Sequence, residues 1–520
     1  MSRHRRGLVH VGFGLFTIGL LGVAPAEGAS SLSRASAASP FADCRIQPLP
    51  DETNYLNAEV EPFVAVNPRN QANVIGVWQQ DRWSFGGARG LMTGVSHDGG
   101  ETWRRTFAHF TRCSGGTAAN NGNYERASDP WVTISPDGTA LQIALTFDFL
   151  LDANQAILVS RSSNEGDTWS EPIVVHADTD PTVADDKETI TADPHDARFV
   201  YAVWDRLEFT DTTQAVLTRG PTVFSRTTDG GRTWERARVI YDPGLDAQTI
   251  SNQIVVLPNG DLVNLLVRFL HANENSPALD DVTLGVIRSR DRGRTWSTPT
   301  IINTLQTIGI TDPKTDEPVR TGDIIPNIAV DPDTGILSVV WQDARFSGRE
   351  RDGIAFSQSR DGGLSWSAPV QINKATRVQA FTPSIAVTDD AIAVTYYDFR
   401  RDNRDPAVLL TDYWRIISNN GGRTWREAHI AGPFDMRTAP FASGFFVGDY
   451  EGLGHTRTDV LPFFVLANSG NLRNRTDVFA TPIDTADQDD RDDREPTRVS
   501  DHGWQQRLDS HRESRRGARH

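Results

Sequence analysis

The stretch Ser96-His97-Asp98-Gly99-Gly100-Glu101-Thr102-Trp103 decides the fold, because its pattern of Ser/Thr, any, Asp, any, Gly, any, Thr, Trp returns along the chain. Further copies lie at residues 227–234, 289–296 and 359–366, and copies with Asn in place of Asp at residues 162–169 and 418–425. In a tight hairpin turn the Asp or Asn side chain bonds turn amides, Gly takes the positive-φ position, and Trp anchors the hairpin in the core. We therefore interpret these six as structural turn residues: Asp98, Asn164, Asp229, Asp291, Asp361 and Asn420.

The six copies recur at intervals of about 60 to 70 residues, which indicates a repeat architecture. Each repeat contains four short apolar stretches bounded by Gly and Pro, and in the first repeat they are residues 63–66, 74–78, 90–96 and 104–110. Four alternating strands per repeat are typical of a propeller blade. The sequence therefore predicts an all-β fold, a β-propeller of four-stranded antiparallel blades.

The expected first strands of the repeats give the number of blades. They begin at Phe63, Trp131, Thr189, Ile254, Ile328, Ile385 and Phe445. The last repeat has three strands, at residues 445–448, 462–467 and 478–481, and no copy of the turn. An N-terminal strand at residues 45–48 would complete this blade and remove the open edges of the ring. Seven blades are therefore preferred, with six as the alternative.

Composition sets the boundaries around the propeller. The chain has 520 residues and a formal net charge of −16, which argues against a nucleic-acid partner and against a polybasic membrane patch. Because a propeller grows by blades, we predict a single domain at residues 44–484. The Ala/Ser-rich residues 27–43 are predicted to be a flexible lead-in, and the charged residues 485–520 a disordered tail.

The N-terminus has the pattern of a secretory signal peptide at residues 1–26. Arg3, Arg5 and Arg6 precede an apolar run at residues 7–24, and Ala24-Pro25-Ala26 places small residues at a cleavage site. We therefore expect a secreted, extracellular or periplasmic protein without membrane insertion after cleavage, and an uncleaved anchor is the alternative.

Cys44 and Cys113 are the two cysteines of the sequence. Export to an oxidising compartment favours one disulfide between them, which would tie the incoming N-terminal segment to the end of the first blade. Two free thiols are the alternative.

Strand directions predict which face carries function. The turn motifs join strands three and four on one face, so the long charged loops between strands two and three lie on the other. Four arginines of these loops are candidates for binding an anionic ligand, since guanidinium grips carboxylates bidentately. They are Arg206, Arg268, Arg345 and Arg401. Asp/Arg pairs repeat at one blade position, however, so ion pairs within a blade are the alternative.

Residues that break the repeat near the first strands are further candidates for catalysis or binding, although each also fits a capped turn or a polar channel lining. They are Glu125, Arg126, Asp129, Lys187, Glu188, Arg320, Asp323, Asp449, Tyr450 and Glu451.

The turn motif resembles the Asp-box of the sialidase and BNR-repeat superfamily, over residues 59–483. Ile325-Pro326-Asn327-Ile328, followed by Trp341-Gln342-Asp343-Ala344-Arg345 and the turn at residues 359–366, resembles the opening blade of a sialidase. In this family an Arg precedes Ile-Pro, a second Arg ends the second strand, a loop Asp is the acid/base, and a Tyr paired with Glu is the nucleophile.

The resemblance assigns roles residue by residue. Arg345 matches the second-strand Arg, Glu350 or Asp352 stands for the loop acid, and Tyr450 is the candidate nucleophile with Glu188 as its partner. The sequence departs from the family at Ile324, which occupies the position of the first carboxylate-binding Arg. Arg320, in the preceding loop, is the candidate substitute.

The resemblance implies a secreted glycoside hydrolase of exo-α-sialidase type that removes terminal anionic sugars from a glycan. One alternative is a non-catalytic propeller that binds glycan or protein, and another is a propeller hydrolase or lyase that acts on a different polysaccharide. A neutral glycan would need two carboxylates from the set Glu125, Asp129, Glu188, Asp211, Asp352 and Asp449. No His/Cys metal pattern is present in the sequence, so we expect no metal and no cofactor, and we expect a monomer.

Overall fold

The computed structural model describes residues 32–149, 154–214, 216–273 and 281–485. The predicted signal peptide and residues 486–520 of the predicted tail lie outside the described residues. Within the described part of the chain, the regular structure consists of β-strands, nearly all in antiparallel pairs, and short 3₁₀ turns: η1 (Arg112–Ser114), η2 (Ala118–Asn120), η4 (Arg345–Ser347) and η5 (Met436–Thr438). None of the described helices is long and apolar enough to cross a lipid bilayer.

Strand pairing in the described residues forms seven antiparallel sets of four, which we call blades 1 to 7. Blade 1 consists of β2 (Glu59–Val66), β3 (Val74–Arg82), β4 (Ala88–Ser96) and β5 (Arg104–Thr106), and blade 2 of β6 (Arg126–Ile134), β7 (Ala140–Phe147), β8 (Gln155–Ser162) and β9 (Ile173–Asp178). Blade 3 consists of β10 (Val183–Ala192), β11 (Val200–Phe209), β13 (Thr222–Thr227) and β14 (Arg238–Tyr241), and blade 4 of β15 (Ala247–Val256), β16 (Leu262–Leu270), β17 (Val282–Ser289) and β18 (Thr300–Thr304). Blade 5 consists of β21 (Asn327–Val330), β22 (Leu337–Asp343), β23 (Gly353–Ser359) and β24 (Val370–Gln371). Blade 6 consists of β25 (Ala380–Val387), β26 (Ile392–Asp398), β27 (Leu410–Ser418) and β28 (Arg426–Asp435). Blade 7 consists of β30 (Gly452–His455), β31 (Asp459–Ala467), β32 (Thr476–Ala480) and β1 (Ser33–Arg34).

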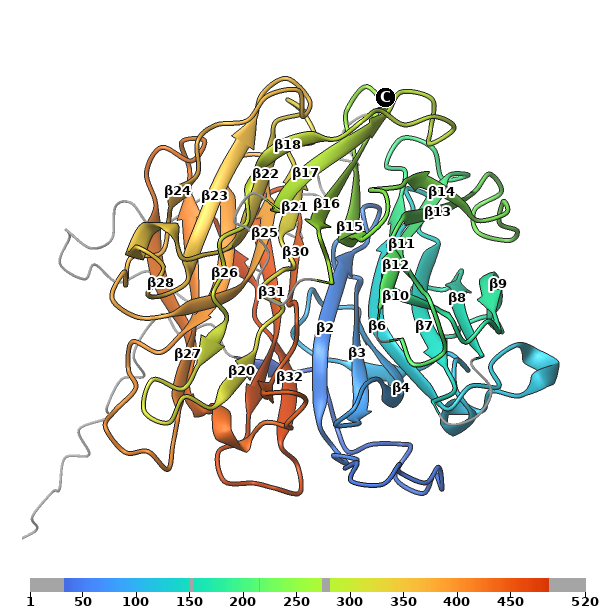
Figure 1. Ribbon diagram of the computed structural model, residues 1–520, viewed down its shortest axis with the longest axis horizontal. Helices are drawn as coiled ribbons and strands as arrows, with labels where there is room; N and C mark the ends of the chain where they lie inside the picture. Colours follow the sequence, from blue (N-terminus) through green and yellow to red (C-terminus); the bar gives the residue numbers. More distant parts are fainter. Residues whose placement is uncertain (1–31, 150–153, 215, 274–280, 486–520) are drawn as a thin grey trace, which may run out of the picture. The chain divides into compact units, whose positions relative to one another are not determined.

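The first strands of neighbouring blades contact one another in ring order, and β30 of blade 7 contacts β2 of blade 1. Figure 1 shows this closure as the blue start of the chain beside its red end. Additional short strands extend the blades or their connections: β12 (Leu217–Arg219), β19 (Ile310–Thr311), β20 (Pro318–Arg320), β29 (Phe445–Phe446) and β33 (Ile483–Asp484). The predicted all-β propeller of four-stranded antiparallel blades is confirmed.

Blade 7 is completed by an N-terminal strand, but the prediction that residues 45–48 form it is wrong. Ser33 and Arg34 of β1 pair with Ala480 and Phe479 instead. This segment is fixed by hydrogen bonds from Ser36 Oγ to Asp477 Oδ1 (2.7 Å) and from Trp103 Nε1 to Ser33 Oγ (3.0 Å). Part of the predicted flexible lead-in therefore forms an ordered blade edge.

The first strand of blade 7 also differs from the prediction. It is β30 (Gly452–His455), whereas the predicted start lies in β29 (Phe445–Phe446), which pairs in parallel with β20. The chain between β29 and β30 is turned toward the ring axis, and this places Asp449 in a cavity wall.

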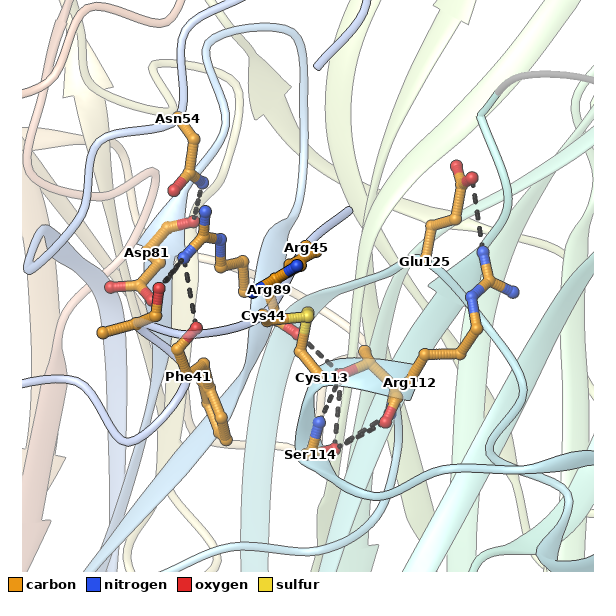
Figure 2. Close-up of a disulfide and its surroundings, with 12 residues drawn as sticks. Phe41, Cys44, Arg45, Asn54, Asp81, Arg89, Arg112, Cys113, Ser114 and Glu125 are labelled. Carbon is orange, nitrogen blue, oxygen red and sulfur yellow. Dashed lines mark hydrogen bonds and ion pairs between the residues drawn. A yellow bond between two sulfur atoms is a disulfide. The ribbon is translucent and has the colours of Figure 1, made fainter. Parts of the chain in front are cut away.

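The predicted disulfide is confirmed. Cys44 and Cys113 are bonded, with a Cα–Cα distance of 5.4 Å and a sequence separation of 69 residues. Figure 2 shows the bridge between the segment of Phe41 and Cys44 and the short turn of Cys113, while Arg89 Nη1 donates to the Phe41 carbonyl (3.1 Å). The N-terminal segment is thus tied to the end of blade 1.

The repeated turns have the hydrogen bonds that their residue pattern predicts. In the first, Thr102 N–H donates to Asp98 Oδ1 (2.9 Å), Gly100 N–H donates to Ser96 Oγ (2.8 Å), and Trp103 Nε1 donates to the Gly100 carbonyl (3.1 Å). Equivalent backbone N–H bonds reach Asn164, Asp229, Asp291, Asp361 and Asn420. Because Asn forms the same turn as Asp, a carboxylate is not required there, and the contacts are those of a structural turn.

Candidate active site

A cavity of about 930 Å³ lies at the end of the first strands opposite to the repeated turns. Its wall combines residues from the starts of first strands, such as Glu61, Asp129 and Lys187, with residues from connections between second and third strands, such as Phe85 and Phe149. The face expected to carry function from strand directions therefore contains this cavity.

A β-bulge recurs where five of the first strands enter the cavity region. Pairing is interrupted in β2, β6, β10, β15 and β25, and each interruption contains one non-glycine residue with positive φ. These residues are Glu61 (53°), Asp129 (52°), Lys187 (43°), Ser251 (66°) and Thr382 (49°). Bulges redirect side chains, and strained backbone of this kind persists where the surrounding structure holds it. The repeated bulge thus presents a different side chain from each of these five blades, and Glu61, Asp129 and Lys187 line the cavity.

Arg320 and Asp449 form an ion pair in the cavity wall. Arg320 Nε lies 3.0 Å from Asp449 Oδ1 and 3.1 Å from Oδ2, and Nη2 also donates to Oδ2. Burial raises the pKa of Asp449, but the charge and hydrogen bonds of Arg320 outweigh burial, and the net pKa is lowered. Asp449 is therefore ionised at neutral pH. The guanidinium groups of Arg320 and Arg82 lie 4.6 Å and 5.0 Å from the centroid of the Phe446 ring.

Glu61 is a buried acid beside this pair. Gln79 donates a hydrogen bond to its carboxyl group, and Arg82 Nη1 donates to Gln79 Oε1 (2.7 Å), which fixes the amide. Burial, followed by the charges of Asp129 and Asp449, raises the pKa of Glu61 well above its usual range. Glu61 is therefore harder to ionise than an exposed glutamate.

Asp129 and Asp186 are the carboxyl groups best suited to chemistry. Both line the cavity from the bulges of neighbouring strands, β6 and β10. Burial and the charge of Asp129 raise the pKa of Asp186 to about 7, against a smaller opposing effect of the Lys187 N–H, which donates to Asp186 Oδ1 (2.9 Å). No group among the described residues donates a hydrogen bond to the Asp129 carboxyl, which leaves it open to a substrate or water. The site thus holds one acid that is protonated up to neutrality beside a second carboxyl group.

Tyr450 and Glu188, the candidate nucleophile and its partner, lie behind the cavity wall. The Tyr450 hydroxyl donates to the Pro130 carbonyl (3.3 Å), and the Lys187 Nζ lies 4.0 Å from the centroid of its ring. Burial, then the charges of Glu61, Asp129, Glu188 and Asp449, raises the pKa of Tyr450 well above its usual range. Both carboxyl oxygens of Glu188 lack a hydrogen-bond partner in the described part of the chain. The structure therefore does not join Tyr450 and Glu188 in a hydrogen bond.

The two candidate loop acids differ in environment. Thr307 Oγ1 lies 2.6 Å from Asp352 Oδ2 and 2.9 Å from Asp323 Oδ2, and burial raises the pKa of Asp352 to about 6. A hydroxyl has one proton to donate, so one of these two carboxyl groups must be protonated when both bonds form. Asp323 lines the cavity, while Asp352 lies behind it. Glu350 is exposed and pairs with Arg351 (3.0 Å).

Of the predicted substrate-binding arginines, the structure brings Arg320 to the cavity and leaves the others outside its lining. Arg345 Nε donates to Asp343 Oδ1 (2.8 Å) and its Nη2 to Asp343 Oδ2 (2.8 Å). Arg206 bonds Asp178 and Asp185, and Arg401 bonds Asp412. Arg268 lies in β16, where its Nε has no hydrogen-bond partner within the described residues. Arg345 and Arg401 thus follow the alternative in which Asp/Arg pairs stabilise single blades, while Arg206 bonds Asp185 of its own blade and Asp178 of blade 2.

Replacing Arg345 with Ala is expected to lower the free energy of unfolding by about 3 kcal/mol, because Asp343, which is fully buried, would lose its charged partner. Urea denaturation measures this change. Arg351→Ala is the matched control, since its pair with exposed Glu350 is expected to contribute under about 1 kcal/mol. Unchanged stability of Arg345→Ala combined with weaker glycan binding would contradict the structural role.

Sequence reasoning missed Glu61 and Asp186. A signal for Glu61 was present, because Glu61-Pro62-Phe63 and Asp129-Pro130-Trp131 place an acid before Pro and an aromatic residue at equivalent positions. Asp186 has no such signal, since it is one member of the charged run Asp185-Asp186-Lys187-Glu188. Among the described residues, no group of three or more His, Cys, Asp or Glu side chains is arranged to hold a metal ion.

No protein-family model matches the chain, and no curated protein matches it in sequence. Its fold is similar to that of a Hadza microbial sialidase, with 15% identity, 79% of this chain and 73% of that chain covered, and a TM-score of 0.46. It is also similar to an α-L-arabinanase from Penicillium chrysogenum complexed with arabinobiose (12% identity, 87% and 98% covered, TM-score 0.46). A third similar structure is an ulvan lyase, a polysaccharide lyase (9% identity, 65% and 76% covered, TM-score 0.43). Likeness at this level does not decide what this chain binds or cleaves.

Proposed function

We propose that this chain is a secreted glycoside hydrolase that acts on a neutral glycan in the 930 Å³ cavity, with Asp186 as general acid and Asp129 as nucleophile or general base. The observation that carries the proposal is the placement of these two carboxyl groups on neighbouring bulges of one cavity, with the pKa of Asp186 raised to about 7. A carboxyl group whose pKa is raised to near neutrality is suited to act as a general acid.

In the proposed reaction Asp186 gives its proton to the glycosidic oxygen as the bond to the anomeric carbon breaks. The Asp129 carboxylate attacks that carbon directly or removes a proton from the attacking water. Asp449 and Arg320 form an ion pair in the wall of the same cavity. Glu61 adds a further carboxyl group to the same wall, with its pKa raised by burial.

A neutral substrate is favoured over the sialoside that the family resemblance implies. Three cationic side chains line the cavity, Arg82, Lys187 and Arg320. Seven acidic side chains also line it: Glu61, Asp129, Asp148, Asp185, Asp186, Asp323 and Asp449. Arg320 already presents Nε and Nη2 to Asp449, and Lys187 Nζ lies against the rings of Trp131 and Tyr450. A carboxylate on the substrate would meet repulsion from these acids, and it could reach Nε and Nη2 of Arg320 only by displacing Asp449.

The test is hydrolysis of a panel of 4-methylumbelliferyl glycosides, with neutral hexosides and pentosides beside a sialoside. We expect release from a neutral glycoside by the unsubstituted protein and none by Asp129→Asn. Glu350→Gln, which removes an exposed carboxylate outside the cavity, is the control and should retain full activity. Hydrolysis of the sialoside alone would instead support the exo-α-sialidase type, and glycan binding without turnover would support a non-catalytic propeller.

Export of the protein is part of the proposal. The disulfide between Cys44 and Cys113 supports it, because disulfides persist in oxidising compartments.

A further inference from the structure

Two phenylalanine rings at the cavity wall are exposed. The Phe85 side chain lies in the connection between β3 and β4 and is 51% exposed, while Phe149 follows β7 and is 43% exposed. Both line the cavity, and they come from neighbouring blades 1 and 2. Large apolar side chains left open beside a polar cavity mark a surface that binds something.

Phe149 is held in place from behind. The Arg126 guanidinium lies 4.5 Å from the centroid of the Phe149 ring and 4.9 Å from that of the buried Trp83 ring. Arg126 is itself 1% exposed and is fixed by two hydrogen bonds to Glu52 (2.6 and 2.8 Å) and one to the Gly86 carbonyl (3.0 Å). The Phe149 N–H also donates to Glu125 Oε2 (3.0 Å). The ring is therefore positioned before any ligand arrives, which lowers the entropy lost on binding.

Polar side chains of the adjoining wall fit the hydroxyl groups of a sugar. The amides of Asn154 and Gln214 and the hydroxyl of Thr212 line the same cavity on the side of blades 2 and 3. A sugar ring has an apolar face of C–H groups and a rim of hydroxyls, so it matches an aromatic ring bordered by amides. The volume of 930 Å³ is near the upper end of the range of about 300–1,000 Å³ found for small-molecule sites, and exceeds the need of a single sugar ring.

We propose that Phe85 and Phe149 form a stacking subsite for a further ring of the glycan chain whose cleaved bond lies at Asp129 and Asp186. The inference rests on the proposed function and narrows its substrate class to neutral oligosaccharides or polysaccharides. Phe149 supplies the fixed platform, and Phe85 supplies a second apolar surface from the next blade.

Binding, rather than turnover, tests the subsite. The Asp129→Asn variant, in which cleavage is prevented, is titrated calorimetrically with cellohexaose, xylohexaose, mannohexaose and maltohexaose. The methyl glycoside of the sugar whose hexaose binds is then titrated in the same way. We expect one hexaose to bind, and Phe149→Ala in this background to weaken that binding about tenfold. Phe85→Ala should weaken it less, and Phe149→Tyr should restore it. Binding of the methyl glycoside should not change.

Leu364→Ala removes an exposed apolar side chain from a repeated turn and is the matched control, expected to bind the hexaose unchanged. Equal affinity of Phe149→Ala and the parent for the hexaose would overturn the subsite, and so would absence of hexaose binding by the parent. If the binding loss is found but the unsubstituted protein cleaves no glycoside, the subsite stands and the hydrolase proposal fails.

Discussion

Replacing Asp186 with Asn is expected to lower kcat for a glycoside with a poor leaving group by about 10²–10⁴-fold, the usual contribution of a general acid. Asn preserves the size of the side chain and accepts the hydrogen bond from the Lys187 N–H, but has no proton to give. Folding should be intact, and a melting temperature close to that of the parent checks this. Loss of activity without loss of structure separates a chemical role from a structural one.

The pH dependence of the same variant gives an independent check. Asp186 acts as an acid when protonated, so kcat of the parent should decrease as the pH rises through its pKa of about 7. Asp186→Asn has no such group, so its residual rate should not show this decrease. Glu350→Gln should retain the parent profile. A parent rate that is constant from pH 6 to 9 would contradict the acid role.

Removal of the disulfide by the double change Cys44→Ser and Cys113→Ser is the second large effect. The bond closes a loop with a sequence separation of 69 residues, and its loss is expected to lower the free energy of unfolding by about 4 kcal/mol. The effect arises because the reduced chain gains conformational entropy when unfolded. Equilibrium denaturation in urea measures it.

Ser36→Ala provides a comparison within the same N-terminal segment. It removes the buried hydrogen bond that Ser36 Oγ donates to Asp477 and the one that it accepts from the Val478 N–H, but leaves the disulfide, and should cost about 1–3 kcal/mol. A double-serine variant as stable as the parent would show that the N-terminal segment contributes little to closure of the ring.

The fold could be predicted because its signal is local. Each repeated turn fixes a hairpin through neighbouring residues, and the bonds around Asp98 and Asn164 are those that the pattern implies. The closing strand could not be located in this way. β1 has two residues, Ser33 and Arg34, with no apolar alternation, and is fixed by contacts with residues more than 400 positions away.

The candidate site was predicted in part. Departure from the repeat indicated Asp129, Arg320 and Asp449, which the structure brings together in one wall. Resemblance indicated Arg345, whose carboxylate partner is Asp343 of its own blade. Asp186 was missed, because its suitability as an acid comes from burial and from the charge of Asp129 on another strand. Such an effect depends on tertiary packing that no local pattern records.

The central claim is that Asp186 protonates the leaving group in a cavity that cleaves glycosidic bonds. The most direct measurement compares kcat/KM of the parent and Asp186→Asn on two glycosides of the same sugar, one with an alkyl and one with a 2,4-dinitrophenyl leaving group. Dinitrophenolate leaves without protonation, so we predict a loss of at least about 10²-fold on the alkyl glycoside and less than about tenfold on the dinitrophenyl glycoside. Equal losses on both substrates would contradict the assignment of Asp186 as the acid.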